Sequence, residues 1–309
     1  MGQNTGLNNY GIRALAHFVD PNSDFRRHTN IEKNVRTFGD DAQENVSIYH
    51  YTSISALKNI LKSGYFRITQ ANSMNDPDEF KWASQRAITY LRSKNATTDQ
   101  VASFKKMIDM TPFRDNYIWS FSKNEDSETL FHIYGVLDGI ALEFGEKDVM
   151  TYLAKHNANG KTDFDQFDLG NAYTFPLTVL YDAEKQIEYI KPLVDEWLDV
   201  YRGIGSDTSH LETINRICVQ NLFLFDMCFK NPKLAHEEEF RFVSVRKNDG
   251  TIQPELKVGN VQYINFRFNP SLIKSITLRP NCSVSKDQFR EMFKEYKLNA
   301  VVKNSTLPY

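Results

Sequence analysis

The stretch SIYHYTSISALKNILKSGYFRIT, residues 47–69, has the pattern of a strand, a helix and a second strand. The first residues alternate between apolar and polar types, as in a half-buried strand. Ser53 or Ser55 is placed to cap the helix that follows, because a serine oxygen accepts from the free N–H groups of a first helical turn. Gly64 is placed to end that helix in a left-handed conformation, and residues 65–69 then return as a strand.

The rest of the sequence adds short strand patterns and long helical patterns. Strands are predicted at residues 117–122, 139–144, 177–181, 240–245, 261–266 and 273–278. The strands do not alternate regularly with single helices, so a doubly wound parallel sheet is not indicated. We predict an α+β fold with helical insertions at about residues 80–112 and 183–230.

The domain organisation follows from where regular patterns begin. Residues 1–45 are polar and interrupted by glycine and proline, so we expect an N-terminal extension with at most a short helix. Residues 46–309 are predicted to form a single α+β domain of catalytic type.

Composition limits the class of protein. Of 309 residues, 41% are hydrophobic, which is enough for a filled core, and the formal net charge of −2 gives no electrostatic case for obligate nucleic-acid binding. The three cysteines lack metal-ligand spacing and are expected to be reduced, and no metal site is assigned. Apolar runs are too short to cross a bilayer and no secretory signal is present, so we expect a cytoplasmic protein with no membrane association. The oligomeric state is left open.

Residues 49–53, Tyr-His-Tyr-Thr-Ser, are the first candidate for a functional site. His50 sits at the end of a predicted strand, beside the N-terminus of a helix that favours an anionic ligand such as phosphate. The alternative is that a ring nitrogen of His50 only caps a neighbouring backbone group. For an isolated histidine this structural role is the more frequent one.

Three other clusters carry polar chemistry. Residues 75–79 place three carboxylates in a turn, which suits either a divalent cation or a loop held by side-chain hydrogen bonds. Ser122 and Tyr134 lie among aromatic residues that form either a stacking wall for a planar ring or part of the core. Glu237, Glu239 and Arg241 share one face of a strand, which fits binding of a ribose diol or, alternatively, a solvated strand edge.

These clusters, taken in order, resemble the successive blocks of a prokaryotic family known only as domain of unknown function 2971. The blocks are Tyr49-His50-Tyr51-Thr52-Ser53, Met74-Asn75-Asp76-Pro77 with Glu79, Phe121-Ser122, Tyr134 with Gly139, and Glu237-x-Glu239-x-Arg241. The resemblance covers roughly residues 47–300. The family usually has Trp where this chain has Phe131, and often a second Trp in the region of His236, departures that affect substrate contacts more than the fold.

The order of these blocks is similar, more distantly, to the layout of ADP-ribosyltransferases. That resemblance implies a split, mostly antiparallel sheet with NAD, as substrate, lying across it. It further implies that His50 hydrogen-bonds the ribose on the adenosine side of NAD and that Tyr134 or Tyr51 stacks on nicotinamide. Thr52, Ser122 and Arg241 would also bind NAD. Glu239, or Glu237, would bind the nicotinamide ribose and act in catalysis.

The function that this resemblance implies is NAD-dependent ADP-ribosyl transfer, in a toxin or a phage-defence effector. The acceptor is left open among a protein, a nucleic acid and water. One alternative is a metal-dependent nuclease that uses Asp76, Asp78, Glu237 and Glu239. Another is a non-catalytic module that binds a nucleotide or a partner.

Overall fold

The structure is a computed structural model that describes residues 8–39, 45–74, 78–110, 116–135, 138–157, 172–203, 208–246, 256–259 and 261–308. Its contacts divide the chain into two compact units, each built from three separate segments. The helical unit comprises residues 1–39, 76–114 and 179–234, and the sheet unit comprises residues 40–75, 115–178 and 235–309. Nothing in this division tests the predicted domain boundary at residue 45, which stays a prediction.

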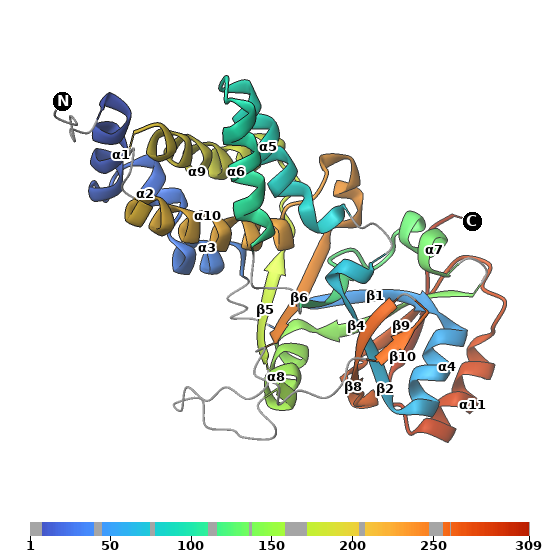
Figure 1. The fold of residues 1–309 in the computed structure, drawn as a ribbon. Helices are drawn as coiled ribbons and strands as arrows, with labels where there is room; N and C mark the ends of the chain where they lie inside the picture. The colour runs from blue at the N-terminus through green and yellow to red at the C-terminus, as the bar shows by residue number, and fades with distance from the viewer. Residues whose placement is uncertain are drawn as a thin grey trace, which may run out of the picture. The chain divides into compact units, whose positions relative to one another are not determined.

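The helical unit is built around two long helices that lie side by side, α9 and α10 (Figure 1). Its helices are α1 (Asn9–Val19), α2 (Asp24–His28), α3 (Ile31–Phe38), η2 (Glu79–Lys81), α5 (Trp82–Ser93), α6 (Thr98–Asp109), α9 (Ala183–Gly203) and α10 (Thr208–Cys228). The short helix η3 (Pro232–Glu237) begins in this unit and ends in the sheet unit. α1 packs against α9, where Arg13 forms two hydrogen bonds with the buried carboxylate of Asp199. The region predicted as an extension therefore contains three helices.

The sheet unit carries a sheet of ten strands in the described part of the chain. Its elements are β1 (Ser47–Ser53), α4 (Ile54–Ser63), β2 (Tyr65–Gln70), η1 (Ala71–Ser73), β3 (Asn116–Ser122), α7 (Glu128–Gly135), β4 (Gly139–Gly145), α8 (Glu146–Asn157), β5 (Ala172–Thr178), β6 (Glu239–Arg246), β7 (Leu256–Val258), β8 (Val261–Arg267), η4 (Pro270–Leu272), β9 (Ser275–Leu278), α11 (Lys286–Tyr296) and β10 (Val301–Asn304). The opening strand–helix–strand prediction is confirmed: the Ser53 side chain caps α4, and Gly64 ends it at a φ of 72°.

The sheet is mostly antiparallel, as predicted, and it splits along one edge of β3. Its main path runs β10-β9-β4-β1-β3-β2-β8-β7, while β5 and β6 extend from the other edge of β3. β10 and β9 are parallel, and the other described strand pairs are antiparallel. β2 pairs with β3 at Tyr117 and Ile118, whereas β1 pairs with the same edge at Ser122. Two strands therefore share one edge of β3, and Ser120 lies between their pairings.

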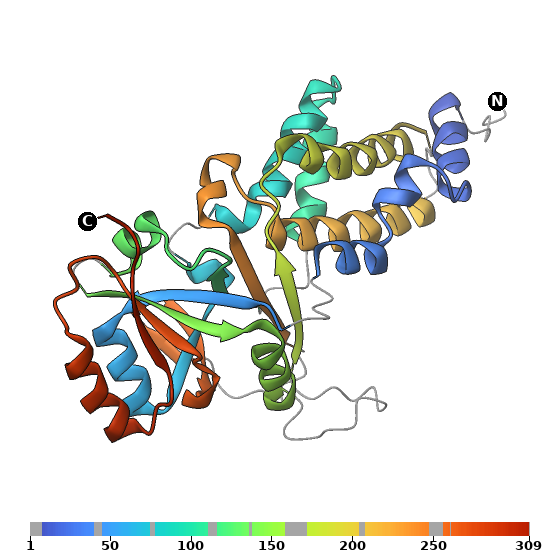
Figure 2. The same cartoon turned by 180° about the vertical axis from the view of Figure 1, so that it is seen from behind.

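Residues in a strand alternate between the two faces of a sheet. The two faces of this sheet differ because aromatic residues occupy one set of alternate positions and several polar residues occupy the other. The aromatic face carries the side chains of Trp119, Phe121, Phe240 and Phe242, and it is covered by α4, α8 and α11. α4 and α11 lie side by side there (Figures 1 and 2). The opposite face, which we call the polar face, is partly covered by α7 through Leu130 and Phe131. Within the described residues, no helix is both long and apolar enough to span a bilayer.

A candidate active site on the polar face of the sheet

A row of polar side chains crosses the polar face from strand to strand. The register pairs Glu239 with Ser122, Ser122 with Tyr49, Tyr49 with Glu143, and Glu143 with Ser275. The row therefore runs over β6, β3, β1, β4 and β9, segments that are far apart in the sequence. We call these five residues the polar row. Hydroxyl and carboxylate groups in such a line are suited to a ligand rich in hydroxyl groups.

Glu239 and Arg241 form a bidentate ion pair at one end of the polar row. Arg241 Nε donates to Glu239 Oε1 at 2.7 Å, and a terminal guanidinium nitrogen donates to Glu239 Oε2 at 2.8 Å. Arg241 is fully buried, while the side chain of Glu239 keeps 8% of its surface exposed. The planar guanidinium fixes the orientation of this nearly buried carboxylate.

The backbone just before Glu239 is held in an unusual conformation. Glu238 has a φ of 44°, in the left-handed region that residues with a Cβ rarely adopt. Its carbonyl oxygen accepts a hydrogen bond from Lys123 N at 2.8 Å, and its carboxylate accepts one from Asn124 Nδ2 at 3.0 Å. This turn separates Glu237, at the end of η3, from Glu239, the first residue of β6.

Ser122 and Glu237 meet at this junction, although through the backbone of Glu237. Ser122 Oγ donates to the carbonyl oxygen of Glu237 at 2.7 Å and accepts a hydrogen bond from Asn124 N at 3.0 Å. Sequence reasoning missed Asn124 and Glu238, because a polar loop residue and one glutamate among three carry no distinguishing pattern.

Tyr51 supports the same loop from the neighbouring strand. Its hydroxyl donates to the carbonyl oxygen of Asn124 at 2.8 Å and accepts from Ser127 N at 2.9 Å, and its ring packs against Phe131. Burial raises the pKa of Tyr51, so the hydroxyl stays protonated. Tyr51 is thus placed to hold the loop that contacts Glu238, while its predicted stacking role stays a prediction.

His50 lies on the opposite, aromatic face, because it alternates with Tyr49 and Tyr51 along β1. Its ring is surrounded by Phe66, Trp119 and Phe121, and its Nδ1 lies 2.9 Å from the carbonyl oxygen of Ser120. A carbonyl oxygen can only accept, so Nδ1 carries the proton and Nε2 is an acceptor. Burial lowers the pKa of His50 to about 4, which keeps the ring neutral near pH 7. This is the geometry of the structural alternative, a histidine that caps a backbone group.

Two other predicted residues are not brought to the end of the polar row that carries Glu239. Thr52 shares the aromatic side of β1 with His50, next to Ile140 of β4. Tyr134 lies on α7 and is 51% exposed. The structure thus gathers Ser122, Glu239 and Arg241 together with the backbone of Glu237, and Tyr51 joins them through the loop.

Glu143 forms a second polar centre in the row, which sequence reasoning also missed. Ser47 Oγ donates to it at 2.7 Å, Ser275 Oγ donates to its other oxygen, and Lys303 Nζ lies 3.3 Å away. Burial alone would raise the pKa of Glu143, but these hydrogen bonds and the lysine charge together lower it. Glu143 is a lone glutamate in an apolar strand, so only the register reveals its partners.

The cluster proposed for a metal-dependent nuclease is described only in part. Asn75, Asp76 and Pro77 lie outside the described residues. Among the residues that are described, no group of three or more His, Cys, Asp or Glu side chains is arranged to hold a metal ion.

Comparisons with known proteins give one distant structural likeness. No model of a known protein family matches the chain, so the resemblance to domain of unknown function 2971 is not confirmed, and no curated protein matches it. A solved structure described as "Thermus sp. 2.9 DarT in complex with ADP-ribosylated ssDNA" aligns with 84% of this chain and 94% of its own. The identity is 16% and the TM-score is 0.31, a likeness too distant to carry an argument about this chain.

Proposed function

We propose that this chain is an ADP-ribosyltransferase-like enzyme that uses NAD as its substrate. The observation that carries the proposal is the carboxylate of Glu239, fixed by the buried guanidinium of Arg241 at one end of the polar row. The ordered resemblance of the sequence blocks to ADP-ribosyltransferases supports the same assignment.

The chemistry needs a fixed negative charge. When the bond between nicotinamide and ribose breaks, its electron pair leaves with nicotinamide and positive charge develops on the ribose ring. A carboxylate that is already oriented stabilises this charge in the transition state without reorganising. An acceptor then supplies a nucleophile and loses a proton. The acceptor is a protein, a nucleic acid or water, and the toxin or phage-defence setting stays a prediction.

The proposal assigns different roles to the predicted residues. Glu239 is the catalytic residue, Arg241 orients it, and Ser122 lies beside it on β3. Because His50 faces the other side of the sheet, a ligand at Glu239 on the polar face would not reach its ring. Binding of the adenosine ribose by His50 is therefore less well supported than the role of Glu239.

The test is an assay of purified protein with labelled NAD and cell lysate, following nicotinamide release and label transfer to protein and nucleic-acid fractions. We expect activity in the wild type and a loss of about a hundredfold or more in Glu239→Gln. Glu239→Asp keeps the negative charge but withdraws the carboxylate by one methylene group, so it tests position if the Gln variant does not fold. Glu291→Gln, on the exposed side of α11, is the matched control.

The outcomes separate the alternatives. A wild type that neither releases nicotinamide nor transfers label contradicts the proposal. Thermal stabilisation by NAD without turnover would then indicate a non-catalytic binding module. Cleavage of nucleic acid that depends on a divalent cation and is indifferent to NAD would indicate the nuclease.

A further inference from the structure

The strands β2 and β8 carry basic and aromatic side chains on their outer face. They pair from Tyr65 with Arg267 to Thr69 with Tyr263, and they lie side by side in the sheet unit (Figure 1). Their inward residues, among them Phe66, join the aromatic core together with residues of α4. The alternate residues point away from that core. We call them the β2–β8 surface: Tyr65, Arg67, Thr69, Tyr263, Asn265 and Arg267.

The β2–β8 surface is positively charged. Arg67 and Arg267 are both exposed, and neither strand contains an aspartate or a glutamate. Neither guanidinium forms an ion pair with any residue that the structure describes. Because Arg67 lies opposite Asn265, it is the diagonal neighbour of Arg267, and such neighbours on one face lie about 7–8 Å apart. The two charges repel each other, so an anion bound between them would be favourable.

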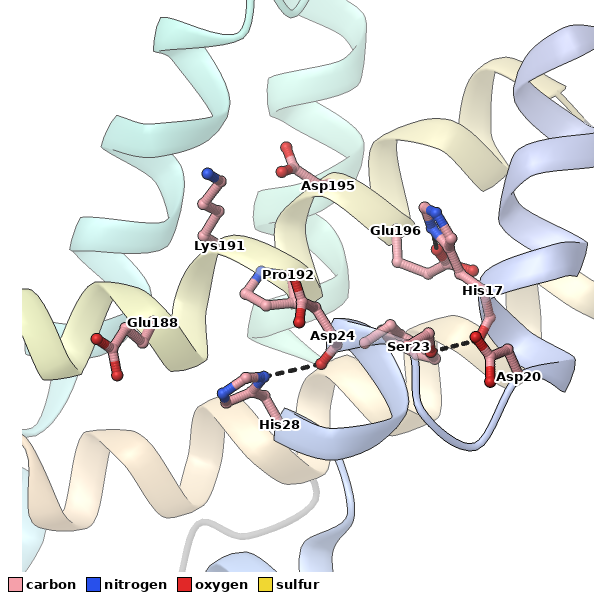
Figure 3. A pocket seen from close by; sticks show the side chains of 11 residues that line it. His17, Asp20, Ser23, Asp24, His28, Glu188, Lys191, Pro192, Asp195 and Glu196 are labelled. Atoms are coloured by element: carbon pink, nitrogen blue, oxygen red, sulfur yellow. Dashed lines mark hydrogen bonds and ion pairs between the residues drawn. The ribbon is translucent and has the colours of Figure 1, made fainter.

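The charged groups around a pocket of the helical unit make a useful contrast. Figure 3 shows this pocket, whose lining is acidic. Several of its carboxylates already have a basic side chain beside them, in the pairs Asp24 with Arg27, Asp195 with Lys94, and Glu196 with His17. Carboxylates that are paired in this way do not select a ligand. The two arginines of the β2–β8 surface, in contrast, keep their charge for a partner outside the chain.

Aromatic rings lie beside these arginines. The guanidinium of Arg67 lies over the ring of Tyr263, 4.7 Å from its centroid, and Tyr263 is 7% exposed. A guanidinium group is planar, so the side of Arg67 that faces away from Tyr263 can stack on another flat group. Tyr65 is 46% exposed and lies two residues before Arg67 on the same face, about 7 Å along the strand. The surface therefore has two places where planar rings can stack, next to two positive charges.

Planar rings joined by phosphate groups are the chemistry of a single-stranded nucleic acid. Its unpaired bases stack on aromatic rings and on guanidinium planes, and its phosphates pair with arginine. A duplex keeps its bases stacked inside and does not present their faces. Asn265 lies opposite Arg67, and Thr69 follows Arg67 on the same face, both half-buried. Their amide and hydroxyl groups donate and accept hydrogen bonds, as does the 2′-hydroxyl group that distinguishes RNA from DNA.

We propose that the β2–β8 surface binds single-stranded RNA. Arg67 and Arg267 pair with phosphates, and bases stack on Tyr65 and on the outer side of the Arg67 guanidinium. Thr69 and Asn265 contact the 2′-hydroxyl groups. The formal net charge of −2 is a sum over the whole chain and does not describe this local excess of positive charge.

The test is a titration of labelled single-stranded RNA of about 12 nucleotides with the full chain, followed by fluorescence anisotropy at several salt concentrations. The wild type should bind saturably, with an affinity that falls as the salt concentration rises. The double variant Arg67→Gln/Arg267→Gln should weaken binding tenfold or more. It should also reduce the slope of log K against log salt by about 1.4, since each lost phosphate contact contributes about 0.7. Tyr65→Ala should weaken binding about tenfold and leave that slope unchanged.

The matched control is Lys58→Gln/Lys62→Gln, which removes two exposed positive charges from α4 on the other face of the sheet and should bind as the wild type does. An absence of saturable binding, or an equal loss in the two double variants, overturns the proposal. It is also overturned if DNA of the same sequence binds at least as tightly as the RNA, or if polyglutamate displaces the RNA at equal charge concentration. The titration contains no NAD, so its result is independent of the function proposed for Glu239.

Discussion

His50 Nδ1 lies 2.9 Å from the carbonyl oxygen of Ser120, at the point where one edge of β3 changes its partner from β2 to β1. A side chain thus supplies a donor to a backbone acceptor at the split in the sheet. A buried carbonyl left without a donor would cost about 1–3 kcal/mol. The histidine therefore stabilises the split itself, whatever else it does.

The neutral state of His50 predicts a dependence of stability on pH. Its pKa is about 4 in the folded protein and about 6.5 in an unfolded chain, so between these values the unfolded chain binds more protons. Stability should therefore fall as the pH falls from 6.5 to 4, by up to about 3 kcal/mol for this group. Urea unfolding of the wild type and of His50→Gln at pH 7 and pH 4.5 measures this contribution. Glutamine is chosen because its amide can donate a hydrogen bond but does not titrate. An unchanged pH dependence in the variant, with His132→Gln as the exposed control, would contradict the assignment.

Removing the hydroxyl of Tyr51 should destabilise the loop that contacts Glu238. Tyr51→Phe keeps the ring but leaves Ser127 N and the carbonyl of Asn124 without this partner, at a cost of about 1–3 kcal/mol. Tyr65→Phe, on a residue that is 46% exposed, is the control and should change little. Thermal or urea unfolding compares the stability of the two variants. Equal effects would show that the hydrogen bonds of the Tyr51 hydroxyl do not stabilise the fold.

The left-handed conformation of Glu238 predicts an inverted order of two substitutions. Glu238→Gly and Glu238→Ala both lose the contact with Asn124, so this loss cancels when they are compared. Glycine adopts a positive φ freely, so the Gly variant should be the more stable by about 1 kcal/mol. At Glu291 in α11, the usual order should hold, with alanine more stable by about 1 kcal/mol. The urea midpoints of the four variants measure both orders of stability. The same order at residues 238 and 291 would contradict the left-handed conformation of Glu238.

The buried pair of Glu239 and Arg241 should respond asymmetrically to single and double substitution. Arg241→Met removes the guanidinium that holds the buried carboxylate of Glu239 with two hydrogen bonds and should cost about 3–5 kcal/mol of unfolding free energy. Adding Glu239→Gln should recover part of that loss, because residue 239 then carries no buried charge. Arg290→Met removes an exposed ion pair on α11 and should cost less than about 1 kcal/mol. A double variant no more stable than Arg241→Met would contradict this view of the pair.

Local features of the fold were predictable because neighbouring residues determine them. Gly64 ends α4 in the expected left-handed conformation. Ser285 and Gln288 likewise form a capping box at the start of α11, a motif that depends on four neighbouring residues. The partners of β3 were not predictable, because β1, β2 and β6 all lie far from it in the sequence. The strand pattern contains no information on which edge a distant strand joins.

The candidate site was predictable to the same extent. Alternation along β6 correctly places Glu239 and Arg241 on one face, but a strand pattern does not show that the two side chains pair with each other. The same alternation separates His50 from Tyr51 on β1, although the block was assigned to a single binding site. Glu143 and Ser275 become neighbours only through the register of β4 with β9.

The interleaving of the two units along the chain has a consequence for synthesis on the ribosome. The helical unit needs residues up to about 234, and the sheet needs β10 at residues 301–304, although β1 is made near residue 47. We therefore expect that this chain does not fold vectorially, that is, with one domain completing its fold before the next is synthesised. Until the later strands are synthesised, the edges of β1 and β2 stay unpaired. We therefore expect the nascent chain to depend on chaperones more than its length alone implies.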